Sequence, residues 1–446
     1  MKRNMIYIIT PLLFFGGCAD LVAPKSRALA DINNTIDIPK NYSTKISSRN
    51  IDDNWIKSFR DPTLNRLVKE ALKNNQNLKV AATRVQRAIA LTNLSQSELQ
   101  PTIGASAFYR DNNSEGASEI SFGGASVSWE PDIWGRVANS VASQEERYRA
   151  TLADYKYTQQ SLAANTAKAW FLLNANSEIY EFTKEIVKLQ EKGLKILDAR
   201  EKIGQGNKRD VHISNALVAS AKEKAQAALT AKQRTQRALE VLLGRYPSAK
   251  LKAKKLYALP PSIPASLPAK LLERRPDLIA AQSRVAAAFY QKESAKLLHM
   301  PNIRLKLGIG PNSINDAITS LSSGIFAPLY TGGAIEAKIA VATADQKSAV
   351  ASYANRALKA FQEVENALSA EKILRKRYEY LKTTEKEYNI AYKMTVERYR
   401  IGESSVLDII IVQGQWIAAE IARVQVAKKL LINRINLHLA LGGSFK

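Results

Sequence analysis

A stretch of more than sixty residues without proline follows a strand-like segment that ends at Gly135. Side chains recur along it at steps of four and three, the heptad-like spacing of a coiled-coil seam. The seam consists of Tyr148, Leu152, Tyr155, Gln159, Leu162, Thr166, Ala169 and Leu173. At about 1.5 Å per residue, a helix over residues 137–203 would be roughly 100 Å long. No ordinary globular domain holds such a helix, so the sequence predicts an elongated, mainly α-helical protein.

The chain matches itself at an offset of about two hundred residues. At an offset of 200, identical pairs include Leu72 and Leu272, Leu78 and Leu278, Arg84 and Arg284, and Pro101 and Pro301. At an offset of 198, they include Tyr155 and Tyr353, Glu181 and Glu379, Arg200 and Arg398, Gly204 and Gly402, and Asp210 and Asp408. Two nearly constant offsets indicate a tandem duplication. We therefore predict two structural repeats, residues 61–244 and 269–442, joined by a proline-rich linker over 245–268.

The N-terminus has the pattern of a secretory signal peptide, with a basic start, an apolar run over residues 6–15 and small residues before a cysteine. This run resembles a bacterial lipobox. We therefore predict a lipoprotein signal peptide over residues 1–17 and lipidation of Cys18, and Ala19 in place of aspartate favours the outer membrane. The alternative is a plain signal peptide with an incidental thiol.

Residues 18–60 are polar and mixed, and we predict an N-terminal leader that packs on the body through Trp55 and Phe59. A helix is expected to start near Asp61-Pro62, because an acidic cap followed by proline in the first turn is a helix start. This helix is expected to run to about Leu99, in front of a proline.

Residue types argue against several functional classes. Cys18 is the only cysteine, and His212, His299 and His438 lie far apart, so neither a disulfide framework nor a metal site is expected. Lys and Arg exceed Asp and Glu by 24 (65 − 41). These cations are mixed with acids along the helices, which is typical of solvated helix faces, so no nucleic-acid partner is expected. No nucleophile–base pair or phosphate loop stands out, and we expect neither an enzyme nor a cofactor.

Strand-like alternation occurs in both repeats, over residues 102–130 and 302–330. In the second repeat one face carries Ile303, Leu305, Leu307 and Ile309, and the other carries Asn302, Arg304, Lys306 and Gly308. About 9–11 residues is the length of a membrane-spanning β-strand, although a soluble hairpin shows the same alternation. No run of eighteen apolar residues follows Cys18, so a membrane crossing is expected to use these strands.

Four strands per chain cannot close a barrel, and open sheet edges are excluded from lipid because their backbone groups would be unpaired. Oligomerisation is therefore expected, and three chains would supply twelve strands. The remaining segments are predicted to be helices: in the first repeat 137–203 and 209–243, in the second 269–299, 334–401 and 405–441, with glycine-containing turns near residues 204 and 402.

Several short motifs resemble the outer membrane efflux protein (TolC-like) family, in its lipoprotein branch. They are Trp55, Asp61-Pro62-Thr63-Leu64, Asn77-Leu78, Ala88, Trp129-Glu130, Asp132-Ile133-Trp134-Gly135, Arg275-Pro276-Asp277-Leu278, Pro328-Leu329-Tyr330, Gly332-Gly333, Tyr399-Arg400-Ile401-Gly402 and Asp408. The resemblance covers almost the entire mature chain and implies a homotrimer with a twelve-stranded barrel in outer-membrane lipid and a long periplasmic α-barrel. It also implies docking with a periplasmic adaptor protein and an inner-membrane RND-type transporter, for which the chain is a passive exit duct.

The resemblance further implies a periplasmic gate at the turns of the two hairpins. Asp210 and Tyr399 match residues whose inter-helix hydrogen bonds hold relatives closed. Ser404 stands where some relatives carry a gate-linking arginine, and Ile411 where many carry a carboxylate, so the constriction is expected to be apolar. Asp408 belongs to the same cluster. The alternative is that Asp210 and Asp408 are only N-cap or turn residues at a helix start.

Arg304 and Lys306 are expected to face the barrel lumen, where they either favour anionic or zwitterionic cargo or have no consequence in so basic a chain. Three functions fit the sequence as a whole. The first is the exit duct of a tripartite small-molecule efflux system, and the second is the duct of a type I protein or peptide secretion system. The third is a lipid-anchored coiled-coil scaffold at the cell surface, which would conduct no ions.

Overall fold

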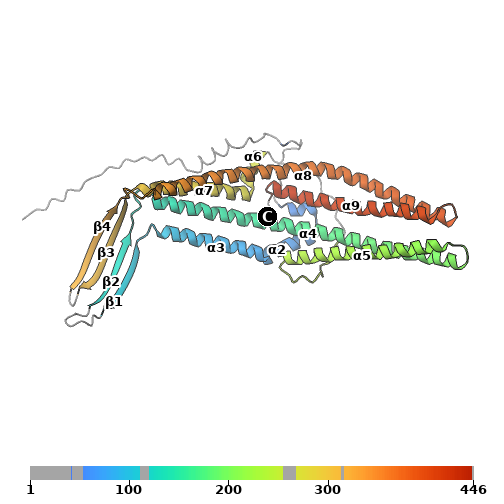
Figure 1. Ribbon diagram of the computed structural model, residues 1–446, viewed down its shortest axis with the longest axis horizontal. Coiled ribbons are helices and arrows are strands. Elements are labelled where there is room, and N and C mark those ends of the chain that lie inside the picture. Colours follow the sequence, from blue (N-terminus) through green and yellow to red (C-terminus); the bar gives the residue numbers. More distant parts are fainter. Residues whose placement is uncertain (1–41, 43–53, 111–119, 255–267, 313–315, 444–446) are drawn as a thin grey trace, which may run out of the picture.

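The computed structural model describes residues 42, 54–110, 120–254, 268–312 and 316–443. They form an elongated molecule, with a β-sheet at one end and the turns of two helical hairpins at the other (Figure 1). The predicted signal peptide and Cys18 lie outside the described residues.

Apart from the short 3-10 helices η1 and η2, both halves of the chain contain the same succession of elements. The first half has η1 (Trp55–Phe59), α2 (Pro62–Asn74), α3 (Gln76–Ser97), β1 (Thr102–Arg110), β2 (Ile120–Trp129), α4 (Arg136–Lys202) and α5 (Lys208–Leu242). The second half has α6 (Pro268–Arg274), α7 (Pro276–Lys296), η2 (Leu297–His299), β3 (Asn302–Asn312), β4 (Asp316–Phe326), α8 (Ala334–Arg400) and α9 (Val406–Ala440). The helices α4 and α8 have 67 residues each, and α5 and α9 have 35 each. The prediction of a mainly α-helical fold with a small β part is confirmed.

Two helices that we expected to be continuous are each broken in the structure. The helix expected from Asp61 to Leu99 is interrupted at Asn75, and the one expected over 269–299 is interrupted at Arg275. Asn75 is extended and its side chain caps α3 by accepting a hydrogen bond from the Leu78 N–H (3.1 Å). Arg275 is extended because it precedes Pro276, which disfavours a helical conformation in the residue before it.

The two breaks occupy equivalent places in the two repeats. Asn75 Nδ2 donates to the carbonyl oxygen of Leu242 at the end of α5 (2.9 Å). Arg275 Nη1 donates to the carbonyl oxygen of Ala440 at the end of α9 (3.2 Å). Each helix break therefore binds a carbonyl at a helix end, where no partner within the helix remains.

The hydrophobic core lies midway along the molecule and has two parts. One surrounds Trp170 and Phe171 of α4 and includes Trp55 and Phe59, so both predicted anchors of the leader are buried. Asp61 joins this part, because its side chain caps α2 and accepts a hydrogen bond from Trp170 Nε1 (2.7 Å). The other part surrounds Val364 and Leu368 of α8. No helix among the described residues combines the length and apolar character needed to cross a membrane.

The sheet is antiparallel in the order β1-β2-β3-β4, so β2 and β3 join the two repeats. Its junction with the helices is held by two tryptophans. Trp129 Nε1 donates to the carbonyl of Leu99 (3.0 Å), and Trp134 Nε1 donates to the carbonyl of Pro301 (2.7 Å). These hydrogen bonds join the sheet to the helical body, to which it lies at an angle (Figure 1).

Candidate functional site

The turns of the α4–α5 and α8–α9 hairpins lie side by side at the end of the molecule opposite the sheet (Figure 1). Gly204 and Gly402 follow the helix ends with φ of 73° and 85°, a conformation that favours glycine. The N–H groups of Gln205 and Glu403 donate to the carbonyls of Arg200 and Arg398 (2.8 and 2.9 Å), respectively. Both turns are thus Schellman motifs, and they terminate α4 and α8 in the same way.

Asp210 and Asp408 lie in the first turns of α5 and α9, where the N-caps are Asn207 and Ser405. Their places are thus those of turn residues at a helix start. Asp408 forms a capping box with Ser405, and its Oδ2 also accepts a hydrogen bond from Ser404 Oγ (3.1 Å). These hydrogen bonds lower the pKa of the Asp408 carboxyl. Asp210 instead lies 3.6 Å from Nε of its neighbour Arg209.

Tyr399 is in the last turn of α8, and its partner is a residue that no sequence motif singled out. The guanidinium of Arg200, in the last turn of α4, lies over the Tyr399 ring at 5.0 Å from its centroid. Within the part of the chain that the structure describes, no hydrogen bond joins Asp210 to Tyr399. Ile411 is 55% exposed on α9 and presents an apolar side chain at the turn end of the hairpin.

The two hairpins contact each other through α4 and α9, along a set of polar and aromatic pairs. Starting from the core, Glu178 pairs with Arg423 (3.4 Å), the rings of Phe182 and Trp416 meet edge to face (5.5 Å), and Gln190 Nε2 donates to Gln413 Oε1 (2.6 Å). We call these pairs the α4–α9 seam. No sequence pattern predicts them, because each pair joins residues more than two hundred positions apart.

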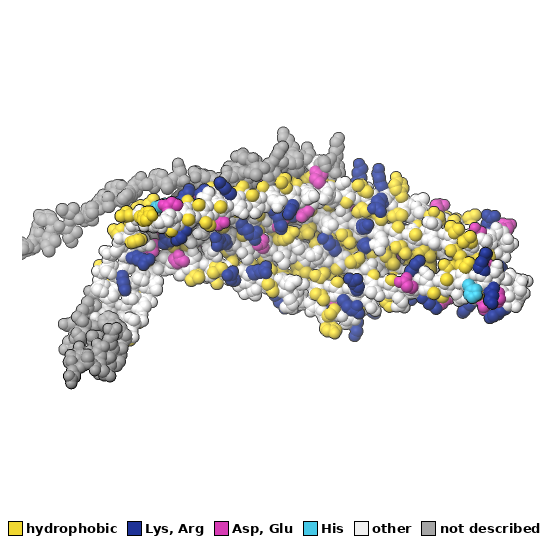
Figure 2. Space-filling model, in the orientation of Figure 1, with side chains coloured by type: hydrophobic (Ala, Val, Ile, Leu, Met, Phe, Trp, Pro, Cys, Tyr) yellow, Lys and Arg dark blue, Asp and Glu magenta, His cyan; other side chains and the backbone are white. Residues whose placement is uncertain are grey.

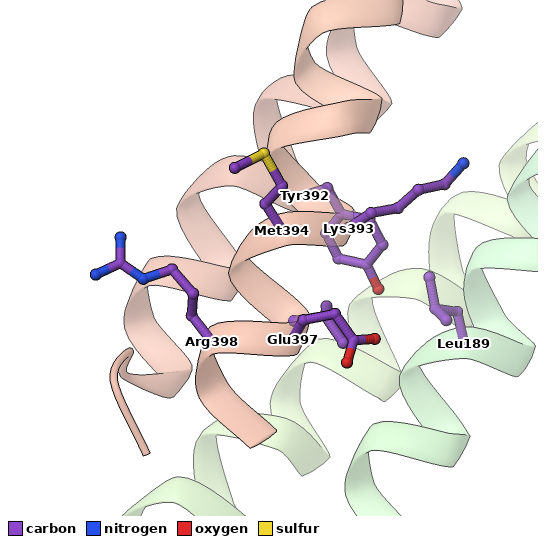
Figure 3. A pocket seen from close by; sticks show the side chains of 7 residues that line it. Leu189, Tyr392, Lys393, Met394, Glu397 and Arg398 are labelled. Atoms are coloured by element: carbon purple, nitrogen blue, oxygen red, sulfur yellow. The ribbon is translucent and has the colours of Figure 1, made fainter. Parts of the chain in front are cut away.

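A groove of about 640 Å³ separates α4 from α8 near the turns. It is lined by Leu189 of α4 and by Tyr392, Lys393, Met394, Val396, Glu397 and Arg398 of α8. In Figure 3 Tyr392 and Glu397 point toward Leu189 across the groove, whereas Arg398 points away. Tyr392 is also stacked on Trp416 (5.4 Å), so the seam supports one wall of the groove.

The register of the sheet separates an apolar face from a polar one. Directly paired residues point to the same face. One level across the sheet holds Ile103, Val127, Leu307 and Leu321, and the adjacent level holds Thr102, Ser128, Lys306 and Ser322. Arg304 is opposite Gly324, two residues before Lys306, and therefore shares its face. Among the strand side chains that the structure describes, these two are the charged ones on the polar face.

Charged side chains on the helical body are distributed along its length (Figure 2). Lys and Arg side chains are spread over the visible face among acidic and apolar ones. Among the described residues, no group of three or more His, Asp or Glu side chains is placed to hold a metal ion.

A family model described as "Outer membrane efflux protein" matches residues 67–245 and 267–443. The chain belongs to the outer membrane efflux protein family. The resemblance found in the sequence is therefore confirmed, and this efflux protein acts at the outer membrane. Members of the family are channels and not enzymes. The relatives of this chain support neither alternative function, the secretion duct or the surface scaffold.

Relatives match the efflux protein along most of its length. It is 25% identical to the antibiotic efflux pump outer membrane protein ArpC of Pseudomonas putida, over 100% of this chain and 96% of the relative. It is 27% identical to the outer membrane protein OprJ of Pseudomonas aeruginosa, over 88% and 86%. It is 23% identical to the probable outer membrane lipoprotein SilC of Salmonella typhimurium, over 100% of both chains.

Solved channel structures have the same fold. The open state of the MtrE outer membrane channel of Neisseria gonorrhoeae is 26% identical, with a TM-score of 0.82 over 92% of this chain and 96% of that one. The CmeC outer membrane channel of Campylobacter jejuni superposes with a TM-score of 0.83 over 92% and 94%. Because the sequence identity to CmeC is 23%, this similarity supports the fold alone.

Proposed function

We propose that three copies of the efflux protein form the exit duct of a tripartite small-molecule efflux system. The observation that carries this proposal is the four-stranded sheet, which has one apolar face, one polar face and two edge strands, β1 and β4. In a membrane both edges must be paired. Three copies joined edge to edge would give a closed twelve-stranded barrel with the polar face toward the lumen. Residues 61–244 and 269–442 would each contribute two strands per chain.

In this proposal the helices continue the barrel into the periplasm, and the hairpin turns form its gate. Asp210, Tyr399, Ser404 and Asp408 lie at these turns, and Ile411 lies one helical turn further along α9. An exposed isoleucine from each copy would narrow the lumen with apolar side chains, which resist the entry of water. The gate would therefore be closed by dewetting as well as by contacts between hairpins.

The duct contains no energy source, so we propose that an inner-membrane RND-type transporter drives export and that a periplasmic adaptor protein docks at the hairpin turns. The names of relatives as efflux pump components support this assignment. We also propose that Cys18 is lipidated and anchors the leader in outer-membrane lipid. The mass of the N-terminal peptide of the mature protein tests this, since an unmodified cysteine would contradict it.

The duct is tested with the full-length protein purified in mild detergent and added to a planar bilayer. We expect a homotrimer by light scattering and discrete ion-conducting steps. As a structural check, cysteines at Ile103 and Leu321, on the apolar face, should resist a water-soluble thiol reagent in intact membranes, whereas a cysteine at Ser128, on the polar face, should react. The cysteines are introduced into a chain in which Cys18 is either lipidated or replaced. A soluble monomer that leaves the bilayer silent would contradict the proposal.

Arg304 and Lys306 provide a second prediction about the duct. Their neighbours across the sheet are the small residues Gly324, Ser128 and Ser322, so the two cations stand clear of bulky side chains. Three copies would place six positive charges near one level of the lumen, and such rings favour ions of the opposite sign. We therefore propose that the barrel prefers anionic cargo.

The preference is measured as a reversal potential in a KCl gradient. The double variant Arg304→Glu, Lys306→Glu should shift this potential toward cation selectivity, and Arg304→Ser, Lys306→Ser should shift it part of the way. The matched control is Lys250→Glu, Lys252→Glu, which makes the same charge change outside the sheet. Equal reversal potentials in all variants would mean that the two cations have no consequence for permeation.

A further inference from the structure

We infer that Arg200 is the residue that latches the two hairpins of the efflux protein together at their turns, through a cation–π contact with Tyr399. The inference rests on the proposed gate and deepens it. Arg200 ends α4 and Tyr399 ends α8, and the guanidinium carbon lies 5.0 Å from the centroid of the ring, within the range of an attractive contact. Both side chains are partly buried, which weakens competition from water.

The position of this contact suits a latch. The α4–α9 seam ends at Gln190 and Gln413, ten residues before Arg200 on α4, or about 15 Å along the helix. Beyond it the groove beside Leu189 separates α4 from α8. Among the described residues, the Arg200–Tyr399 pair is the only hydrogen bond, ion pair or ring contact between the two hairpins on the turn side of Gln190 and Gln413. Separating the turns therefore breaks this pair first.

The internal duplication explains why Arg200 is available for this role. Its equivalent in the second repeat, at an offset of 198, is Arg398. Arg398 pairs within its own turn with Glu403 (3.5 Å). The residue equivalent to Glu403 is Gln205, which carries no charge to hold Arg200. The equivalent of Tyr399 is Glu201, so only the second repeat offers a ring. The first turn thus supplies the cation of this contact, and the second turn supplies the aromatic ring.

The neighbouring carboxylates do not substitute for this contact. Asp210 lies beside Arg209, and Asp408 is held by Ser404 and Ser405. A latch made by a ring face also makes a chemical prediction that a hydroxyl-based latch does not. The phenol oxygen of Tyr399 is dispensable, because phenylalanine presents a similar face to a cation.

The test measures the fraction of time that full-length channels spend in their high-conductance state in planar bilayers. Arg200→Gln and Tyr399→Leu should raise the open-to-closed ratio by about two- to fivefold for each latch that is removed, and by more where three copies open together. Tyr399→Phe should behave as the unaltered protein. Combining Arg200→Gln with Tyr399→Leu should add little to either change alone, because both remove one interaction.

The matched control is Lys222→Gln, which removes a cation whose ion pair with Glu191 (2.9 Å) lies within the first hairpin, and which should leave the ratio unchanged. Equal circular dichroism and trimer content of all variants would show that they fold. If Tyr399→Phe opened the channel as much as Tyr399→Leu, the hydroxyl would be the link and the inference would be overturned. It would also be overturned if Arg200→Gln had no effect on channels that conduct. The absence of current from every variant, with and without the latch, would instead overturn the proposed duct.

Discussion

Replacing Arg275 with alanine should destabilise the efflux protein by about 3–5 kcal/mol, because it leaves a carboxylate buried without its main partner. Arg275 and Asp277 have side-chain exposures of 3% and 2% and are joined by two hydrogen bonds (3.0 and 2.9 Å). Arg275 also reaches Glu363 (2.6 Å) and the carbonyl of Ala440. Burial by itself raises the pKa of the Asp277 carboxyl, but the hydrogen bonds and charges of Arg275 and Arg356 lower it below its usual value.

The destabilisation should be measured as the free energy of unfolding in denaturant, followed by circular dichroism. Arg284→Ala is the matched control, because Arg284 lies on the same helix α7 and pairs with Asp154, with both side chains about half exposed. Exposed pairs contribute only about 0–1 kcal/mol. If the free energy of unfolding decreased by a similar amount in the two variants, the buried position of Arg275 would not be the cause of the destabilisation. Asp277→Asn removes the negative charge that pairs with Arg275 and should also be strongly destabilising.

The helix breaks at Asn75 and Arg275 show how far the sequence alone predicts the helices. The heptad spacing and the absence of proline predict α4 and α8 almost to the residue, because these signals are local and repeat many times. The breaks at Asn75 and Arg275 are not predicted. The one at Asn75 depends on a partner far along the chain, because Asn75 binds the carbonyl of Leu242. The break at Arg275 has a local signal, because Pro276 disfavours a helical conformation in the residue before it and fits the first turn of a new helix. The single helix expected over 269–299 overlooks this signal.

The same distinction applies to the hairpin turns. The alternation in β3 places Arg304 and Lys306 on one face, and the register of the sheet agrees. The turn residues are found by resemblance, but their partners are not, because Arg200 and Tyr399 come together only when α4 and α8 pack through α9. One signal for Arg200 does exist in the sequence. Aligning the repeats pairs Glu403 with Gln205, so Arg200 lacks the carboxylate that its equivalent Arg398 has in Glu403.

The latch and the core lie at separate places along the long helices. The α4–α9 seam connects the region of Trp170 to the turns, so the hairpins can separate at their ends while the core remains packed. This division suits a channel that must open repeatedly. The contacts at the turns are partly exposed and modest in energy, whereas the clusters around Arg275 and Asp61 are buried and resist change.

Acid should destabilise the core through His438 of α9. This side chain is 4% exposed and stacked on Trp55 (ring centroids 5.4 Å apart), and among the described residues neither of its nitrogens has a hydrogen-bond partner. Burial, with a smaller contribution from the charge of Arg434, lowers the pKa of His438 to about 3. Above pH of about 6.5 the imidazole is neutral in both the folded and the unfolded chain, and it does not lower the stability.

As the pH falls below about 6.5, the unfolded chain binds a proton that the folded chain cannot accept, so stability declines until the pH approaches 3. At pH 5 the decrease is about 2 kcal/mol per chain. His438→Phe keeps a ring against Trp55 and removes the titrating group, so the difference in unfolding free energy between pH 7.5 and pH 5 should shrink by about this amount. His212→Phe, at an exposed position of α5, is the control and should keep the full pH dependence. If the pH dependence of the unfolding free energy were unchanged in His438→Phe, groups other than His438 would cause the acid sensitivity.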